Sequence, residues 1–368
     1  MSKKIVIVSY ATYPGTSPRN LRTHELAKEF VRKGHEVKLY VLTGDYDYSS
    51  YEQETGIKVV SLGKTFFFNY NPETGAKLNI FSRIIKKFFG KFFEYPFIEL
   101  IRNVYFSLMV EKEIDLLITI AVPYPIHWGA ALFKTINKDR LKDVTWVADC
   151  GDPYMGNDFS KYPFYFSYIE KWCFRKVDFI SIPIEAAKSG YYQEFHKKIK
   201  IIPQGIDFDQ IKITKNYGKN SIPTFIYAGI FYENKRDPRP LLDYLIELNI
   251  EFKFIIYTRN HNFLKNYEER LIGKLEVRPY IPRVEVIFEM SKADFLINFD
   301  NPSEKHSPSK LIDYALSKRP ILSINSSETL NKAIVNEFLN GDYSNKFIID
   351  DIDKYNISRV VDQFLDIL

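Results

Sequence analysis

The sequence predicts an α/β protein of two doubly wound parallel sheets that face each other across a cleft. Short runs rich in Val and Ile alternate with amphipathic stretches at helical spacing along all 368 residues. The strand runs are apolar throughout, which is typical of parallel strands covered by helices on both faces. The alternation pauses once, in a polar segment, and then restarts. We therefore expect two Rossmann-like domains with right-handed crossovers.

The first half of the chain carries the strands of the first predicted sheet. Apolar residues at helical spacing between these strands predict helices over Leu21–Arg32, Pro125–Asn137 and Tyr162–Arg175. Each helix would cover one face of the sheet and connect two parallel strands. The predicted strands are Lys4–Ser9, Glu36–Leu42, Ile57–Leu62, Asp115–Ile120, Asp143–Ala148, Val177–Ile182 and Lys200–Ile202.

The second half begins after a polar linker over 207–223, which contains the run Gly218–Ser221. With a boundary near Phe208, the first domain spans 1–207 and the second spans 208–368, and the last helix can cross back to the first domain. The predicted strands of the second domain are Thr224–Ala228, Phe252–Tyr257, Leu275–Arg278, Phe295–Asn298, Ile321–Ile324 and Phe347–Ile349.

Composition excludes several classes of protein. With 45% apolar and 26% charged residues, the chain is neither disordered nor collagen-like. The formal net charge of +5 is too weak to indicate a nucleic-acid partner. Cys150 and Cys173 are the two cysteines, which excludes a disulfide scaffold and favours a reducing compartment. No apolar run approaches the roughly 20 residues of a membrane span, and Ile5–Val8 is too short for a signal peptide. We expect a cytoplasmic protein.

The loop after the strand Phe295–Asn298 carries an unusual helix start. Ser307-Pro308 reads as an N-cap followed by the first helical residue. Lys310 stands where a capping box would place Glu. A cation at this position opposes the helix dipole, which costs a few tenths of a kcal/mol, and a bound anion would reverse the sign.

These residues predict a phosphate site. The N–H groups of Ser309, Lys310 and Leu311, together with the Lys310 ammonium, would bind the anion. Asp313 lies on the same helix face, where its carboxylate could accept hydrogen bonds from sugar or ribose hydroxyls. A surface Lys310–Asp313 pair on a capped helix explains the same residues equally well.

A second basic loop, Ala228–Pro238, follows the first strand of the second domain. Gly229 permits close approach of the backbone to a ligand. Lys235 and Arg236 precede a predicted helix start, and the Arg236 guanidinium can bind a diphosphate with two parallel hydrogen bonds. A solvated turn is the commoner explanation for a single Lys-Arg pair. Two basic helix-entry loops in one domain, however, strengthen the phosphate interpretation.

Two loops of the first domain are candidates for the acceptor side of a site. Tyr10–Arg19 lacks the G-x-G-x-x-G dinucleotide fingerprint, but Gly15 lies at a strand-to-helix junction where a substrate would be covered. In the same loop, Ser17-Pro18 repeats the Ser-Pro cap of a helix start, followed by a basic first turn. Asp149–Pro153 places two carboxylates around a glycine, where they could bind hydroxyls or act as a base, although capping of the next segment is the favoured alternative. The acceptor-side candidates are Tyr13, Arg19, Asp149 and Asp152.

No motif indicates a metal site or a nucleophilic triad. The six His and two Cys lack zinc-ligand spacing, and neither G-x-S-x-G nor a Walker A motif occurs. The D-x-D pairs at 45/47, 207/209 and 351/353 fall in loops or at a helix start. We therefore expect no metal and no resident cofactor.

The stretch Phe81–Phe93 has the clearest helical periodicity in the chain. Its aromatic and aliphatic residues share one face, whereas Arg83, Lys86, Lys87 and Lys91 are its only charged residues. A basic helix with an aromatic face is typical of interfacial helices on anionic bilayers. A helix packed on the sheet, with its lysines in solvent, is the alternative.

In the order and spacing of its motifs, nearly end to end, the chain resembles the GT-B glycosyltransferases of retaining family 4. The resemblance implies a GT-B fold and a hexosyltransferase that takes sugar from a nucleoside-diphosphate donor without a metal ion. The donor would lie mainly on the second domain. The motifs that carry the resemblance are Tyr13–Arg19, Leu26–Val37, Ile202–Asp207, Tyr227–Gly229 with Lys235-Arg236, and Pro308–Ala315 before Arg319–Leu322.

The resemblance also implies roles for single residues. Arg236 matches the phosphate-binding lysine of the family, and Asp313 stands where the family has the second Glu of an E-x7-E pair, which holds the ribose. Lys305 occupies the place of the first Glu, and Ile230 that of an Arg. We expect a catalytic set of Arg236, Lys310 and Asp313. The donor-binding set is Gly15, Gly229, Lys235, Arg236, Pro279, Tyr280, Ser309, Lys310, Leu311 and Asp313.

The expected function is therefore transfer of a sugar to a glycan or lipid-linked acceptor during cell-envelope polysaccharide synthesis. The expected location is the cytoplasm at the inner face of the membrane, with peripheral contact through Phe81–Phe93 and no nucleic-acid partner. Two alternatives remain open. A nucleotide-sugar 2-epimerase of the same fold would bind the same donor without an acceptor, and a non-catalytic subunit would bind nucleotide sugar and release no nucleoside diphosphate.

Overall fold

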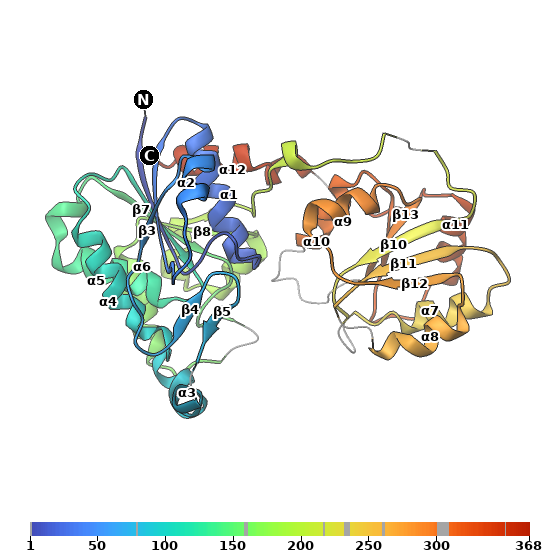
Figure 1. The fold of residues 1–368 in the computed structure, drawn as a ribbon, viewed down its shortest axis with the longest axis horizontal. Coiled ribbons are helices and arrows are strands. Elements are labelled where there is room, and N and C mark those ends of the chain that lie inside the picture. The colour runs from blue at the N-terminus through green and yellow to red at the C-terminus, as the bar shows by residue number, and fades with distance from the viewer. Residues whose placement is uncertain are drawn as a thin grey trace. The chain divides into compact units, whose positions relative to one another are not determined.

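The computed structural model describes residues 2–78, 80–157, 161–215, 218–231, 236–259, 262–299, 309–349 and 351–368. For Leu141 and Ser309 it describes the backbone alone. The chain divides into two compact units (Figure 1). Unit 1 comprises Met1–Ile206 and Tyr355–Leu368, and unit 2 comprises Asp207–Lys354. Each unit is an α/β structure around a parallel sheet.

Unit 1 contains a seven-stranded parallel sheet in the order β3-β2-β1-β6-β7-β8-β9. The order reverses between β1 and β6, which pair in register from Ile5 with Leu116 to Ser9 with Ile120. Such a reversal is the point where doubly wound sheets bind ligands, beyond the carboxyl ends of the strands. The strands are β1 (Lys4–Ser9), β2 (Glu36–Val41), β3 (Lys58–Ser61), β6 (Leu116–Ala121), β7 (Thr145–Cys150), β8 (Phe179–Ile182) and β9 (Ile199–Ile201).

Helices cover both faces of this sheet, which explains why its strands read as continuous apolar runs. Ile5 and Ile7 belong to the core beneath α1 and α12, whereas Val6 and Val8 belong to the core beneath α4, α5 and α6. The helices are α1 (Pro18–Arg32), α2 (Ser49–Thr55), α3 (Ile80–Phe93), α4 (Leu100–Met109), α5 (Pro125–Ile136), α6 (Phe166–Lys176) and α12 (Ile357–Leu365).

Unit 2 repeats the plan with a five-stranded parallel sheet in the order β12-β11-β10-β13-β14, which reverses between β10 and β13. Its cores lie on both faces of the sheet, one beneath α7, α8 and α11 and the other beneath α9 and α10. The elements are β10 (Thr224–Ala228), α7 (Arg239–Glu247), β11 (Lys253–Tyr257), α8 (Lys265–Arg270), β12 (Leu275–Arg278), α9 (Arg283–Met290), β13 (Phe295–Phe299), α10 (Ser309–Leu316), β14 (Ile321–Ile324) and α11 (Lys332–Asn340).

Two local predictions are wrong. Phe347–Ile349 forms no strand, although the Phe347 N–H donates to the Ile321 carbonyl at 2.8 Å. A hairpin of β4 (Asn69–Asn71) and β5 (Gly75–Lys77) lies where no strand was predicted, because its strands are too short and too polar to show periodicity. The Asn71 side chain accepts two backbone N–H groups of the turn, which closes the hairpin.

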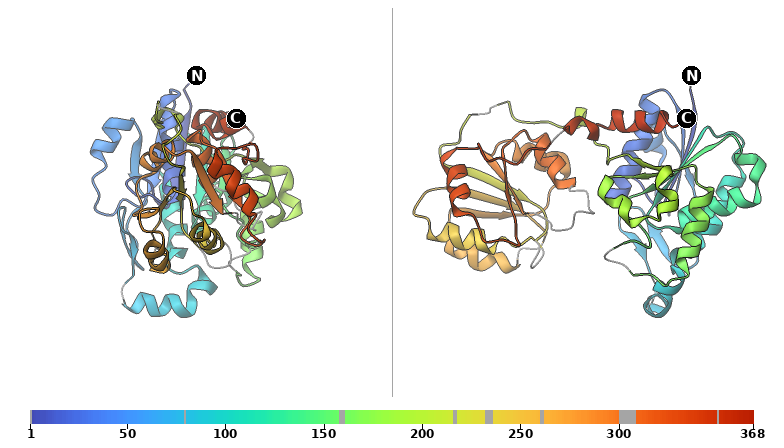
Figure 2. Two further views of the ribbon diagram at one scale, coloured as in Figure 1. Left: turned by 90° about the vertical axis from the view of Figure 1, so that its right-hand side faces the viewer. Right: turned by 180° about the vertical axis from the view of Figure 1, so that it is seen from behind.

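The last helix lies in unit 1 (Figure 2). The chain leaves unit 1 at Ile206 and returns beside it, because the Ile206 N–H donates to the Tyr355 carbonyl at 2.8 Å and the Ile357 N–H to the Ile206 carbonyl at 2.9 Å. The Asn356 side chain caps α12 by accepting the Ser358 N–H. Phe364 of α12 is fully buried in the core beneath α1. Unit 2 is thus inserted between two segments of unit 1.

Candidate functional site

The strand order of unit 2 brings the carboxyl ends of β10 and β13 together. These two strands, each followed in the sequence by one of the basic loops, are neighbours at the reversal of the sheet. Gly229 follows β10 with a φ of +152°, and a Cβ placed on it would lie 3.4 Å from the Lys310 Nζ atom of α10. Lys310 therefore extends from its helix to the end of β10.

The Lys310 ammonium is buried without a hydrogen-bond acceptor among the residues that the structure describes. It lies 3.4 Å from the centre of the Tyr227 ring and 5.1 Å from that of Tyr314, so cation–π attraction offsets part of its desolvation. Burial, together with the charge of Arg236, lowers the pKa of Lys310 well below its ordinary value. A buried cation without an anion is costly, and a bound phosphate would supply that anion.

Asp313 pairs with Arg283 and not with Lys310, so the surface Lys310–Asp313 pair is wrong. The Arg283 Nε atom donates to the Asp313 carboxylate at 2.7 Å, and its Nη2 atom donates to the same oxygen. Burial raises the pKa of Asp313, and the Arg283 guanidinium opposes that shift. Arg283 begins α9, thirty residues before Asp313, and no spacing in the sequence indicated this partner.

The structure describes some of the remaining predicted residues of these two loops and not others. Arg236 is close enough for its charge to act on Lys310 and Tyr314. Leu311 is buried in α10, and Ser309 is the first residue of that helix. Lys235, Ser307 and Pro308 lie outside the described residues.

Tyr314 is a positioning residue that the sequence interpretation did not single out. Its hydroxyl accepts the Ala228 N–H at 3.0 Å, which joins α10 to the end of β10. The Tyr227 hydroxyl donates to the Ile230 carbonyl at 3.1 Å and so holds the chain just beyond Gly229. The two tyrosines, one from each element, enclose the Lys310 side chain.

A cavity of about 610 Å³ adjoins the loop after β12, which carries the predicted donor-binding residues Pro279 and Tyr280. Pro279 lines this cavity, whereas Tyr280 is more than half exposed and lies beneath the Arg259 guanidinium at 4.3 Å. Arg278 donates to the Tyr257 hydroxyl at 2.8 Å and thereby joins the ends of β11 and β12. The cavity and an exposed aromatic ring thus lie at the carboxyl edge of the sheet.

Asp149 does not have the predicted acceptor-side environment. It is buried at the end of β7, where Arg22 donates to both carboxylate oxygens at 2.6 and 3.0 Å and Ser181 adds a bond of 2.6 Å. Burial alone would raise the pKa of Asp149, but Arg22 and Arg19 hold it below its ordinary value. The sequence did not indicate this ion pair, because its members lie 127 residues apart.

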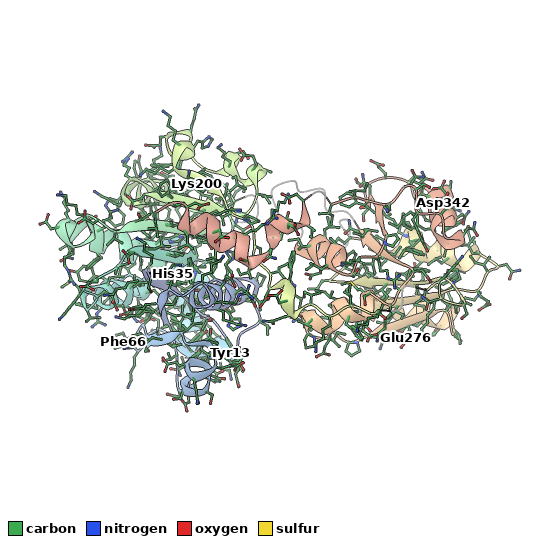
Figure 3. All side chains as sticks on the ribbon, turned by 90° about the horizontal axis from the view of Figure 1, so that it is seen from above. Tyr13, His35, Phe66, Lys200, Glu276 and Asp342 are labelled. Carbon is green, nitrogen blue, oxygen red and sulfur yellow. The ribbon has the colours of Figure 1, made fainter. Side chains whose placement is uncertain are left out.

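The loop after β1 is held by aromatic packing. Tyr13 is 44% exposed and stacks on Tyr51 with 5.3 Å between ring centres (Figure 3). Gly15 lies against Asn20, and Arg19 lies against Gly151, since a Cβ on either glycine would collide with these side chains. Ser17 caps α1 and Pro18 begins it, as predicted.

Asp152 also follows β7. Its carbonyl oxygen accepts the Tyr124 hydroxyl at 2.7 Å, which ties the loop after β7 to the start of α5. Tyr13 and Asp152 therefore lie on loops at the carboxyl edge of the unit 1 sheet, and Arg19 lies in the first turn of α1. Among the described ranges, no group of three or more His, Cys, Asp or Glu is placed to hold a metal ion.

Replacing Gly229 by Ala is expected to weaken binding of inorganic pyrophosphate by tenfold or more. The added Cβ would lie 3.2 Å from the Tyr227 hydroxyl and 3.4 Å from the Lys310 ammonium, at a φ that L-residues rarely adopt. Calorimetric titration measures the affinity. Gly273→Ala is the matched control, because Gly273 has a φ of +81° in open space. Equal weakening by both variants would mean that backbone strain, and not the site, is responsible.

No protein-family profile matches this chain, and no curated protein is significantly similar to it. Solved structures nevertheless share its fold. A glycosyltransferase from Rickettsia africae ESF-5 is 12% identical with a TM-score of 0.61, over 100% of this chain and 97% of that chain. TarM of S. aureus is 11% identical with a TM-score of 0.63, over 100% and 99% of the two chains. HepE of Anabaena, in complex with UDP-glucose, is 10% identical with a TM-score of 0.58, over 100% of both. At these identities the likeness shows the fold, which is the GT-B fold of two α/β domains.

Proposed function

We propose that this chain is a retaining, metal-independent glycosyltransferase of the family 4 type, which moves a hexose from a nucleoside-diphosphate sugar to an acceptor hydroxyl. The observation that carries the proposal is the buried Lys310 ammonium beside Gly229, which has no acceptor among the described residues. A diphosphate is the ligand that supplies the missing negative charge. The fold agrees with this function, since similar structures contain UDP-glucose or UDP.

In the proposed reaction, the bond between the sugar C1 and the β-phosphate oxygen breaks, and a bond from C1 to the acceptor oxygen forms on the same face. The proton of the acceptor hydroxyl passes to the departing phosphate oxygen. Negative charge therefore develops on the diphosphate. Lys310 and Arg236, with the first N–H groups of α10, would stabilise that charge, and the burial of Lys310 supports this role because a desolvated site strengthens the interaction.

Asp313 and the cavity after β12 account for the rest of the donor. The Asp313 carboxylate, oriented by Arg283, would accept hydrogen bonds from the ribose hydroxyls. The nucleobase would lie beside Pro279 and Tyr280, where the exposed Tyr280 ring offers a stacking surface. These contacts bind the substrate and the transition state alike, so they should act mainly on KM.

We assign the acceptor to Tyr13 and Asp152, which lie on loops of unit 1, and to Arg19 in the first turn of α1. Tyr13 provides a half-exposed ring, and sugar rings bind readily to such apolar faces. The acceptor would be a glycan or a lipid-linked intermediate of an envelope polysaccharide. The reaction would take place in the cytoplasm, at the inner face of the membrane.

A screen of nucleoside-diphosphate sugars tests this function. A donor present at a hundred times its Kd should raise the free energy of unfolding by about 2.7 kcal/mol. With a suitable acceptor, the protein should then release nucleoside diphosphate at a rate that a chelator does not change. The anomeric configuration of the product, determined by NMR, should equal that of the donor.

Other outcomes would replace the proposal. Conversion of UDP-N-acetylglucosamine alone into its 2-epimer would identify an epimerase. Donor binding without release of nucleoside diphosphate for any acceptor would identify a non-catalytic subunit. A product of inverted configuration, or activity that a chelator abolishes, would contradict the retaining and metal-independent parts of the proposal.

A further inference from the structure

Helix α3 exposes its apolar face instead of packing it on the sheet. All fourteen of its residues are described, and Ser82 is the one buried among them. Ile80 is 78% exposed, Phe81 71% and Phe88 62%, and four other apolar side chains of the helix are also largely exposed. Contiguous apolar surface of this kind marks an interaction site. The alternative in which α3 packs against the core is therefore wrong.

The charged side chains of α3 are all basic and all exposed. They are Arg83, Lys86, Lys87 and Lys91, and the helix contains no Asp or Glu. Near an anionic lipid surface, each basic residue raises the affinity for the membrane by about fivefold. The combination of an aromatic face with a basic one therefore matches an anionic bilayer in both hydrophobicity and charge.

The length of α3 determines how it can lie in a bilayer. Fourteen residues extend about 21 Å, which is shorter than the roughly 30 Å hydrocarbon core. None of the helices among the described residues has the length and apolar character that a membrane span requires. A short amphipathic helix of this kind lies in the plane of the interface, with its aromatic face among the acyl chains.

Hydrogen bonds fix α3 to the rest of unit 1. The Tyr95 hydroxyl donates to Ser82 at 3.0 Å, and the Tyr165 hydroxyl donates to the Phe92 carbonyl. Just beyond the helix, Glu94 accepts the hydroxyl of Tyr154, which belongs to the loop after β7, at 2.8 Å. The helix is thus coupled to the loop that also carries the acceptor candidate Asp152.

The exposed apolar face of α3 lies at one particular end of unit 1. In Figures 1 and 2, α3 lies at the end of the unit opposite the amino terminus, from which β1 starts. The carboxyl ends of the parallel strands therefore point toward the end where α3 lies.

We infer that α3 docks unit 1 in the plane of an anionic lipid bilayer, with its aromatic face inserted and Arg83, Lys86, Lys87 and Lys91 on the lipid headgroups. A second copy of this chain is a poorer occupant, because a symmetric contact would bring eight like charges together without an acid from either α3. Presentation of the loops after β1 and β7 to a lipid-linked acceptor is a consequence that also rests on the proposed function.

Vesicle sedimentation of the full chain, without donor or acceptor, tests this inference. The protein should bind vesicles of phosphatidylcholine with phosphatidylglycerol and bind vesicles of phosphatidylcholine alone much more weakly. Binding should fall at about 1 M salt, where the Debye length is roughly 3 Å. Because no sugar chemistry is involved, failure here would leave the proposed glycosyl transfer to be judged by its own assay.

Two sets of variants distinguish insertion of the aromatic face of α3 from electrostatic attraction between its lysines and anionic lipids. Phe81→Ser and Phe88→Ser should each lower partitioning by about tenfold or more. The triple variant Lys86→Gln, Lys87→Gln and Lys91→Gln should lower it by about two orders of magnitude on anionic vesicles only. All these side chains are exposed, so the melting temperature should not change.

Matched controls use equally exposed side chains elsewhere. Ile272→Ser, which removes an 81% exposed apolar residue of unit 2, should leave vesicle binding unchanged. The triple variant Lys112→Gln, Lys138→Gln and Lys142→Gln should do the same. Absence of binding to anionic vesicles would overturn the inference. A dimer in solution that Phe88→Ser converts to a monomer would instead assign the face to a second copy.

Discussion

Lys310→Met is expected to make the protein more stable and to weaken its affinity for nucleoside diphosphates. The wild-type ammonium is buried over the Tyr227 ring with no hydrogen-bond acceptor among the described residues. Its replacement by an apolar side chain of similar length should raise the free energy of unfolding by about 1 to 3 kcal/mol. The loss of one preorganised charge on the departing diphosphate should lower kcat by about 10² to 10³. Denaturant titration and a nucleoside-diphosphate release assay measure the two effects.

The pH dependence of stability provides a second readout for Lys310. Its pKa in the folded protein lies below 10.5, so the unfolded chain binds more protons in the alkaline range. The free energy of unfolding of the wild type should therefore increase as the pH rises toward 10.5. The difference in stability between Lys310→Met and the wild type should decrease over the same range. Lys265→Met, at an exposed position on α8, is the control and should change neither property. A Lys310→Met variant that is less stable and binds UDP as tightly as the wild type would exclude the proposed phosphate site.

Arg22→Met is expected to destabilise unit 1 by about 3 to 5 kcal/mol, the largest loss of stability that we predict. The substitution leaves the Asp149 carboxylate buried without its main partner. Arg22 also donates to the carbonyls of Ile202 and Pro203 and lies 5.7 Å from the centre of the Phe364 ring, so three segments lose a common contact. Denaturant titration measures the change in the free energy of unfolding.

The free energy of unfolding at acid pH should also depend on the Arg22–Asp149 pair. The pKa of Asp149 is lowered in the folded protein, so its stabilisation is present above pH 3.8 and is lost as the pH falls through the folded value. Arg22→Met should remove this acid dependence. Arg175→Met, which breaks an exposed pair with Glu194, is the control and should cost less than about 1 kcal/mol. A similar cost for both variants would contradict a structural role for the Arg22–Asp149 pair.

Most of the fold was predictable because its signal is local. The runs Lys4–Ser9 and Thr224–Ala228 became strands with exactly the predicted bounds, since parallel strands buried on both faces consist of continuous apolar residues. The Ser17-Pro18 helix start was likewise correct, because a cap depends on residues adjacent in sequence. The β4–β5 hairpin was missed because three-residue polar strands carry no periodicity.

The site was predictable only for residues whose position follows from the order of the strands in the sheet. Gly229 and Lys310 meet because the order of the sheet makes β10 and β13 neighbours, and strand-end loops were the expected ligand sites. The roles of the carboxylates were harder to predict, because the environment of an Asp depends on which cation the fold brings to it. Asp313 pairs with Arg283 and Asp149 pairs with Arg22, and both arginines lie far from their partners in the sequence. Nothing in the local pattern separates a ligand-binding carboxylate from a buried ion pair.

The return of the chain at Asn356 has a consequence for synthesis on the ribosome. Unit 1 buries Ile357, Val360, Val361 and Phe364, which are translated after the whole of unit 2. Its core therefore stays incomplete while all of unit 2 emerges and can already fold. Deletion of α12 would expose the apolar side chains of α1 that it covers, although α1 precedes unit 2 in the sequence, and would leave unit 2 intact.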